Sequence, residues 1–84
     1  MQAEQQTKNA YQQWRDASSH EDHVRNVYRT MLNLERATSL SSPLFWLRTQ
    51  ARHEIRIMYD AAMQQTDAAM ARYQRSQQQT SEAA

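Results

Sequence analysis

Ser41-Ser42-Pro43 lies almost at the middle of the 84-residue chain, which contains no glycine. Serine is a favoured N-cap, and proline is tolerated at the first helical position because its missing N–H would have no helical partner there. These three residues therefore combine a helix end with a helix start. Because the sequences on both sides are long and rich in helix-forming residues, the chain is predicted to be all-α, an antiparallel two-helix hairpin.

The predicted hairpin occupies residues 9–77, with its turn at 39–43 and its second helix starting at Pro43. The polar residues 1–8 are expected to be frayed. The glutamine-rich residues 78–84 contain nothing large to bury and are expected to form a disordered tail.

One interruption of the first helix has to be considered. Ser18-Ser19-His20-Glu21 fits a capping box, with Ser18 as the N-cap and Glu21 at the third helical position. The segment is therefore either one long helix or two helices separated by a kink. A continuous or slightly kinked helix is favoured, because neither glycine nor proline enforces a break.

Composition indicates a small core. Hydrophobic residues make up 39% of the chain, and mean hydropathy is −1.02. A core of this size supplies roughly 3–5 kcal/mol of stability. Because the chain has no cysteine, disulfides and thiolate metal sites are excluded. Oligomerisation or docking on a partner is therefore the expected source of further stability.

Charge and hydropathy favour no broad attraction to nucleic acid or membranes. Ten Lys+Arg against nine Asp+Glu leave a formal charge of +1. No apolar run approaches the ~20 residues of a membrane span, and residues 1–6 lack the apolar stretch of a secretory signal. A cytoplasmic location is expected, with export by a route without a cleaved signal left open.

Helical spacing predicts the seam between the helices. In the second half, apolar residues follow a 3-4-4 spacing that repeats every eleven residues. These residues are Leu44, Leu47, Ala51, Ile55, Met58, Ala62, Thr66, Ala69 and Tyr73. A rougher stripe in the first half comprises Ala10, Ala17, His20, Val24, Val27, Met31 and Leu34. Folding about the turn places Glu35 level with Arg48, so a salt bridge between them is expected.

The side chains left beside this seam gather on one aromatic and methionine-rich face, where Trp14 is expected near Met70 and Tyr28 near Tyr59. A large exposed apolar patch usually marks an interface, and aromatic residues, arginine and methionine are enriched there. The predicted protein interface comprises Tyr28, Leu32, Phe45, Arg52, Arg56, Tyr59, Met63 and Met70. Trp46 and Ile57 point elsewhere, and Trp46 is expected to cap the end of the hairpin or to form a separate contact.

Two further features of the sequence bear on metal binding and catalysis. His20 and His23 have the spacing of a metal-ligand pair, but no third ligand is implied, so neither a metal nor a cofactor is predicted. His20 is interpreted as a seam residue. No glycine-rich loop and no nucleophile–base pair is present in the sequence, which predicts a non-enzymatic protein.

The arginines follow rows with helical spacing. The residues are Arg25, Arg29, Arg48, Arg52 and Arg56. Such rows can bind phosphates, which makes a nucleic-acid-binding helical bundle an alternative function. A protein interface is favoured because the charge is balanced and Lys8 is the only lysine.

Ser42-Pro43 at mid-chain and Asp67-Ala68-Ala69-Met70 late in the second helix resemble elements of type III secretion needle subunits, which have a similar length. The resemblance implies an exported helical-hairpin subunit of a bacterial secretion apparatus. Those subunits usually carry an Asn/Asp-Pro turn, and their chains end soon after the Asp-Ala-Ala element, whereas this chain continues beyond it.

The function expected from the sequence is a small non-enzymatic protein–protein interaction module or regulator. It would bind a partner protein or itself through the aromatic and methionine-rich face. A four-helix bundle is the simplest closure, because an isologous contact buries the same patch twice.

Overall fold

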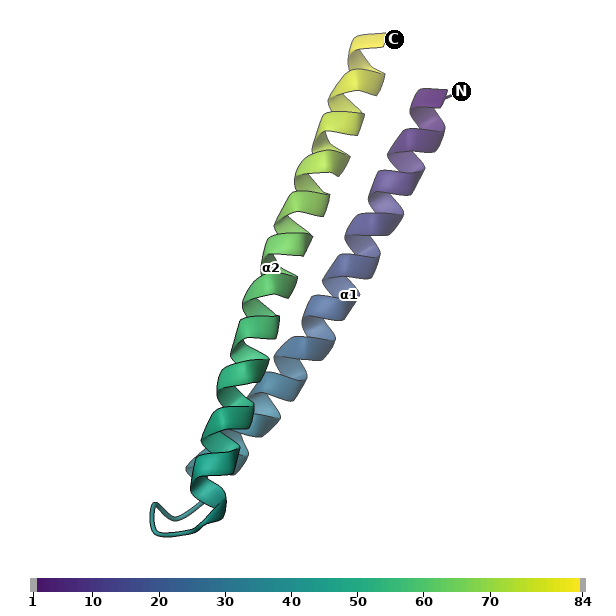
Figure 1. Ribbon diagram of the computed structural model, residues 1–84. Coiled ribbons are helices and arrows are strands. Elements are labelled where there is room, and N and C mark those ends of the chain that lie inside the picture. The colour runs from purple at the N-terminus through teal and green to yellow at the C-terminus, as the bar shows by residue number, and fades with distance from the viewer. Residues whose placement is uncertain (1, 84) are drawn as a thin grey trace.

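The computed structural model describes the backbone of residues 2–83 and the side chains of residues 3–79. It contains two helices, α1 (Gln2–Arg36) and α2 (Leu44–Ala83). The helices lie antiparallel and side by side, with the loop at one end and the start of α1 beside the end of α2 at the other (Figure 1). The resulting rod measures 65 × 13 × 13 Å between Cα atoms. The prediction of an all-α, antiparallel two-helix hairpin is confirmed.

The helices are longer than the sequence suggested. α1 passes through Ser18 and Ser19 without a break, which agrees with the favoured continuous helix. It also includes part of the 1–8 segment expected to fray, and α2 includes most of the 78–84 segment expected to be disordered. Both segments are rich in glutamine, alanine and glutamate, which have high helix propensity. Met1 and Ala84 lie outside the described residues.

The turn is held by serine hydroxyls. Ser42 Oγ accepts a hydrogen bond from the backbone N–H of Leu44 at 3.2 Å, and the carbonyl of Ser42 accepts one from Phe45 at 3.1 Å. Ser42 is therefore the N-cap of α2, and Pro43 occupies the first position, where it has no N–H to lose. The loop folds further through the Ser42 N–H, which donates to the carbonyl of Ser39 at 2.9 Å.

The seam repeats every seven residues, so the expected eleven-residue repeat is wrong. Buried and half-buried positions alternate by four and three residues in both helices, the pattern of a left-handed coiled coil. On α1 they are Ala3, Thr7, Ala10, Trp14, Ala17, Glu21, Val24, Tyr28, Met31 and Glu35. On α2 they are Phe45, Arg48, Arg52, Ile55, Tyr59, Ala62, Thr66, Ala69, Tyr73 and Ser76.

Five residues assigned to the seam from the sequence are exposed instead. They are His20, Leu34, Leu44, Leu47 and Met58. The prediction placed the largest aliphatic side chains inside. The structure instead packs aromatic rings between the helices, separated along the rod by small alanine positions. Pairs of aromatic rings occupy the seam, where long aliphatic side chains were expected. Compared with the predicted orientation, α2 is therefore rotated about its own axis, and its leucines are exposed.

The register also differs from the expected one. Arg52 Nε donates to Glu35 Oε2 at 2.6 Å, whereas Arg48 donates instead to the hydroxyl of Thr38. The partner of Glu35 thus lies one helical turn further along α2 than predicted. Ring contacts set this register, and the 37–43 loop accommodates the difference.

The core of the hairpin is small. Its buried hydrophobic residues are Ala10, Val24, Ala62 and Ala69, and none of the described large side chains is fully buried. The chain exposes 6411 Å². A compact monomer of 9.9 kDa exposes about 5,200 Å², so the hairpin presents about 1,200 Å² more than a compact fold would.

Candidate interaction surfaces of the hairpin

The structure divides the predicted aromatic and methionine-rich face into two groups. Tyr28, Phe45, Arg52 and Tyr59 occupy seam positions between the helices. The other four residues each follow a seam residue directly, so they lie on one flank of the hairpin. We call this flank the arginine–methionine flank and define it by Leu32, Arg56, Met63 and Met70. Leu32 and Met63 are half-buried, whereas Arg56 and Met70 are exposed.

An aromatic pair joins the two groups. The rings of Tyr28 and Tyr59 lie 5.8 Å apart between centroids, as the sequence predicted. The Arg56 guanidinium lies over both rings, 5.5 Å from the centroid of Tyr28 and 5.6 Å from that of Tyr59. Cation–π contacts of this kind hold Arg56 against the seam. Tyr28 and Tyr59 therefore contact residues within the hairpin, where they join α1 to α2.

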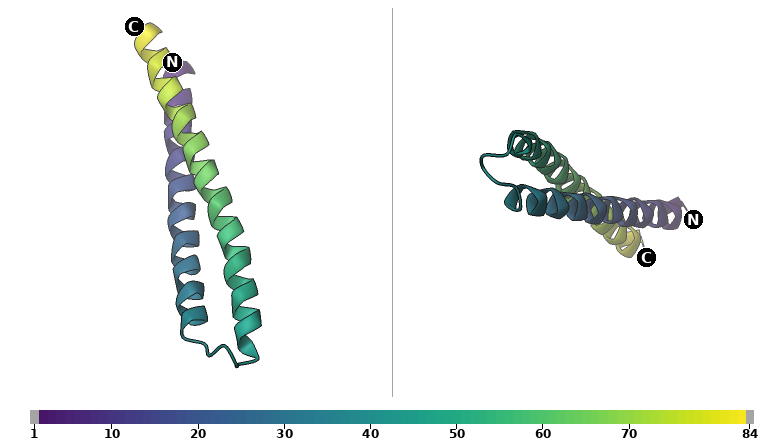
Figure 2. Two further views of the ribbon diagram at one scale, coloured as in Figure 1. Left: turned by 90° about the vertical axis from the view of Figure 1, so that its left-hand side faces the viewer. Right: turned by 90° about the horizontal axis from the view of Figure 1, so that it is seen from below.

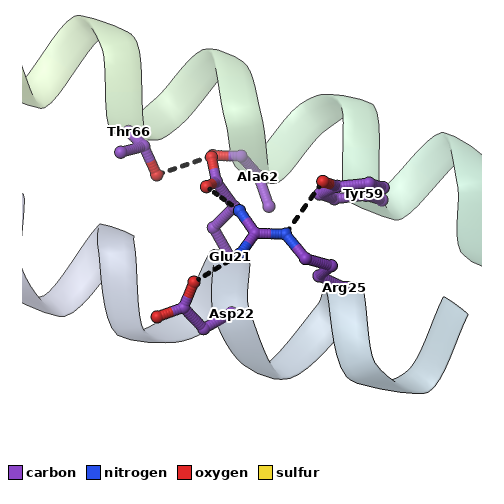
Figure 3. A network of polar contacts seen from close by, with 6 residues as sticks. All are labelled: Glu21, Asp22, Arg25, Tyr59, Ala62 and Thr66. Atoms are coloured by element: carbon purple, nitrogen blue, oxygen red, sulfur yellow. Dashed lines mark hydrogen bonds and ion pairs between the residues drawn. The ribbon is translucent and has the colours of Figure 1, made fainter. Parts of the chain in front are cut away.

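Arg25 connects the helices through a polar network (Figure 3). Its Nε donates to the hydroxyl of Tyr59 on α2 at 3.0 Å, and its two terminal nitrogens donate to Asp22 at 3.0 Å and Glu21 at 2.9 Å. The hydrogen bond to Tyr59, followed by the nearby charges, raises the pKa of Arg25. The guanidinium is therefore a permanent cation held by its own chain.

Glu35 and Arg52 form the interhelix ion pair nearest the loop. Their side chains are 17% and 27% exposed, so the pair is more sheltered than an ordinary surface salt bridge. The hydrogen bond to Glu35 raises the pKa of Arg52 against the opposing effect of desolvation. The pair links α1 to α2 near the loop.

Most of the arginine row is engaged within the chain. Arg25 and Arg52 bind carboxylates as described, Arg56 pairs with Asp60 at 3.2 Å, and Arg48 donates to Thr38. Phosphate binding would require these guanidinium groups to exchange their present partners. The geometry thus gives little support to a continuous phosphate-binding track.

A second aromatic cluster closes the open end of the hairpin. Trp14 stacks on Tyr73, with centroids 5.5 Å apart and ring planes at 17°, so its ring partner lies about one helical turn beyond the Met70 suggested by the sequence. Tyr11 lies 5.4 Å from Tyr73 and 6.0 Å from Trp14, again between centroids. The three rings tie the distal parts of both helices together.

A second apolar stripe runs along α2, and sequence reasoning did not separate it from the seam. Its members are Leu44, Leu47, Ala51, Met58, Ala61 and Ala68. Each directly precedes a seam residue, so the stripe is rotated by about 100° around the helix. Ala51 is half-buried and the other five are exposed. The seven-residue spacing was the available signal, but the larger side chains of the stripe were assigned to the seam.

The loop end presents apolar side chains to solvent. Trp46 is 65% exposed and Leu40 is 83% exposed, so the expectation that Trp46 caps the hairpin is wrong. Ile57, which was expected to point away from the predicted interface, is 58% exposed. Trp46 and Leu40 thus form an exposed surface at the loop end, whereas Ile57 lies eleven residues beyond Trp46 along α2.

The hollows of the surface offer no evident chemistry. One groove of about 370 Å³ near the open end is lined mainly by polar side chains, including Gln6, Gln13, Gln79, Arg72 and Arg75. A second, of about 300 Å³, runs beside Tyr11 and Trp14. Within the described residues, no three His, Cys, Asp or Glu side chains gather as metal ligands, and neither helix is long and apolar enough to cross a membrane.

Comparison with known proteins adds no assignment. No family model matches the sequence, and neither a curated protein nor a solved structure matches it significantly. The resemblance to needle subunits therefore stays a prediction, as does the cytoplasmic location.

Proposed function

We propose that the protein is a small, non-enzymatic interaction module whose hairpin associates with another helical hairpin, in the simplest case a second copy of itself. The observation that carries this proposal is the imbalance between a core of four small residues and about 1,200 Å² of surplus surface. A standard protein interface buries about 800 Å² on each partner. The surplus is therefore large enough to supply one such interface.

The second stripe is the surface that best fits a helical partner. It repeats every seven residues, as the seam of the hairpin does, and its alanines permit close approach of another helix. Met58, in the middle of the stripe, is 52% exposed and has apolar area to bury, and Leu44 and Leu47 extend the stripe toward the loop with 49% and 62% exposure. Covering the stripe would convert the hairpin into half of a four-helix bundle.

If two α2 helices pair antiparallel, the opposite charges that lie along the second stripe can pair with each other. Glu54 interrupts the stripe, and Arg72 lies further along the same line of α2. When Glu54 of one copy lies level with Arg72 of the other, Met58 faces Ala68 across the two-fold axis. Opposite charges and a large side chain against a small one then meet in the same register.

The arginine–methionine flank is the alternative surface. Leu32, Met63 and Met70 could contact a partner there, with Arg56 at the rim, as the sequence suggested. Leu32 and Met63 are already half-buried within the hairpin, so this flank exposes less apolar area to a partner than the second stripe does. Nucleic-acid binding has weaker support, because most of the arginine row is paired within the chain.

Paired substitutions distinguish the two surfaces. Met58→Glu places a charge on the second stripe, and Met63→Glu places the same charge on the arginine–methionine flank. An unpaired charge at an interface costs at least about 2 kcal/mol, so Met58→Glu is expected to raise the dimer Kd at least about 30-fold. Met63→Glu should leave the Kd within about threefold, a change of less than about 1 kcal/mol.

Sedimentation equilibrium measures both constants, with circular dichroism to verify that each variant remains helical. A folded Met58→Glu variant that dimerises as tightly as the unmodified protein would exclude the second stripe. Loss of association in Met63→Glu alone would move the interface to the arginine–methionine flank.

A further inference from the structure

The loop end of the rod contains an uncharged segment bracketed by arginines. Residues 37–47 lack any charged side chain, and they lie between Arg36 and Arg48. Their large apolar members are Leu40, Leu44, Phe45, Trp46 and Leu47. Phe45 is half-buried in the seam, whereas the other four are 49–83% exposed.

The loop of this segment lies at one narrow end of the rod (Figures 1 and 2). The cross-section there is only 13 × 13 Å between Cα atoms, whereas a standard protein interface needs about 800 Å² from each partner. A small convex apolar tip offers too little area for a standard protein interface. A lipid bilayer imposes no such requirement, because its interface deforms around whatever apolar area is inserted.

The charges around the tip favour an anionic surface. Residues 29–56 contain five arginines and two glutamates, a formal charge of +3, although Arg52 pairs with Glu35 and Arg56 pairs with Asp60 just beyond this range. The whole chain has a formal charge of +1, so the remaining residues carry −2. The near-neutral net charge thus hides a rod with one positive end. Basic residues close to a membrane are attracted to anionic lipid headgroups.

We propose that the loop end inserts into the interfacial layer of an anionic lipid bilayer and anchors the rod by its tip. Leu40 and Leu47 enter the boundary between headgroups and acyl chains. Trp46 lies at headgroup level, where its amphipathic ring is favoured. The exposed Arg36 contacts lipid phosphates, and the helices extend away from the surface without crossing it.

Flotation with phospholipid vesicles tests this assignment on the full chain. Vesicles of phosphatidylcholine with phosphatidylserine are compared with vesicles of phosphatidylcholine alone. We expect the protein to float with the anionic vesicles, to float less with the neutral ones, and to show a blue-shifted tryptophan emission when bound. The double variant Leu40→Ser/Trp46→Ser should lose at least about tenfold in vesicle affinity.

Ile57→Ser is the matched control, because Ile57 is a comparably exposed apolar residue on the shaft, away from the tip. It should float as the unmodified protein does. The proposal is overturned if the unmodified protein fails to float with anionic vesicles, which would leave an acidic protein as the partner of this end. Equal flotation of the tip variant, or equal loss in Ile57→Ser, also overturns it.

Leu44 and Leu47 belong both to the second stripe and to the tip, so the vesicle test is repeated with Met58→Glu, whose substitution lies on the shaft. A Met58→Glu monomer should still bind anionic vesicles through its single tip.

Discussion

The two halves of the rod use their apolar residues in opposite ways. All four buried residues lie outside the turn half, and the Trp14–Tyr73–Tyr11 cluster closes the open end. The turn half, residues 29–56 with the adjoining Ile57 and Met58, holds most of the exposed large apolar side chains. The open half therefore packs within the hairpin, whereas the turn half presents apolar and positively charged surface to other molecules.

This difference separates the residues that fold the hairpin from those available for binding. Substitutions in the open half are expected to change the free energy of unfolding. Substitutions on the exposed face of the turn half are expected to change association or membrane binding while the helices persist.

Ala62→Glu should have the largest effect on folding. Ala62 is 2% exposed in the seam, so a glutamate there would bury a charge at a cost of several kcal/mol, comparable to the whole stability of a domain this small. We expect loss of most helical signal in circular dichroism at room temperature. Ala71→Glu, at an exposed position of α2, is the control and should fold normally.

The two tryptophans offer the most direct comparison of the two halves. Trp14→Ala removes a half-buried ring stacked on Tyr73 and should lower the free energy of unfolding by about 2 kcal/mol. Trp46→Ala removes an exposed ring and should change it by less than about 0.5 kcal/mol. Urea unfolding of both variants at a fixed protein concentration gives these values. Equal losses would show that the turn half is not a free surface.

Ser42→Ala tests the capped start of α2. Removing the hydroxyl that accepts from Leu44 N–H should cost about 1 kcal/mol, the usual worth of a serine N-cap. Ser41→Ala is the matched control, because Ser41 Oγ shares a hydrogen bond with the hydroxyl of Ser39 within the loop, and the Ser41 backbone N–H that donates to Ser39 Oγ is kept in the variant. Thermal melts should therefore separate the neighbouring serines. Identical midpoints would place the cap elsewhere.

Glu35→Gln should give the smallest shift. The substitution removes the carboxylate that pairs with Arg52, and we expect a lower melting midpoint than in the unmodified protein at low salt. Because the pKa of Arg52 is raised, its cation persists at ordinary pH, so salt rather than pH is the variable to change. The difference should shrink at high salt. A salt-independent difference would indicate lost packing instead of lost charge attraction.

Much of the fold follows from local sequence signals. Ser42 and Pro43 supply the cap and first position of α2, and uninterrupted helix formers predict a continuous α1. Which face of α2 packs against α1 was harder to predict, because α2 carries two apolar stripes that are offset by one residue. Choosing between them depends on whether Tyr59 and Tyr73 can pair with rings on α1, which is a tertiary contact that periodicity alone does not reveal.

The candidate surfaces were predictable to the same limited extent. Leu32, Arg56, Met63 and Met70 were placed together on one flank, and the structure keeps them together. Tyr28 and Tyr59 were correctly paired, but their contact lies within the hairpin. The exposed tip around Trp46 was underestimated, because an aromatic residue beside a turn was expected to fold over it.

Sedimentation equilibrium of the unmodified chain across a wide range of concentrations tests the central claim most directly. Since the hairpin has a small core and a large surplus of exposed surface, it should sediment as a particle of twice the 9.9 kDa chain mass and dissociate on dilution into helical monomers. A particle of 9.9 kDa at every concentration would contradict the claim that the second stripe binds a second copy.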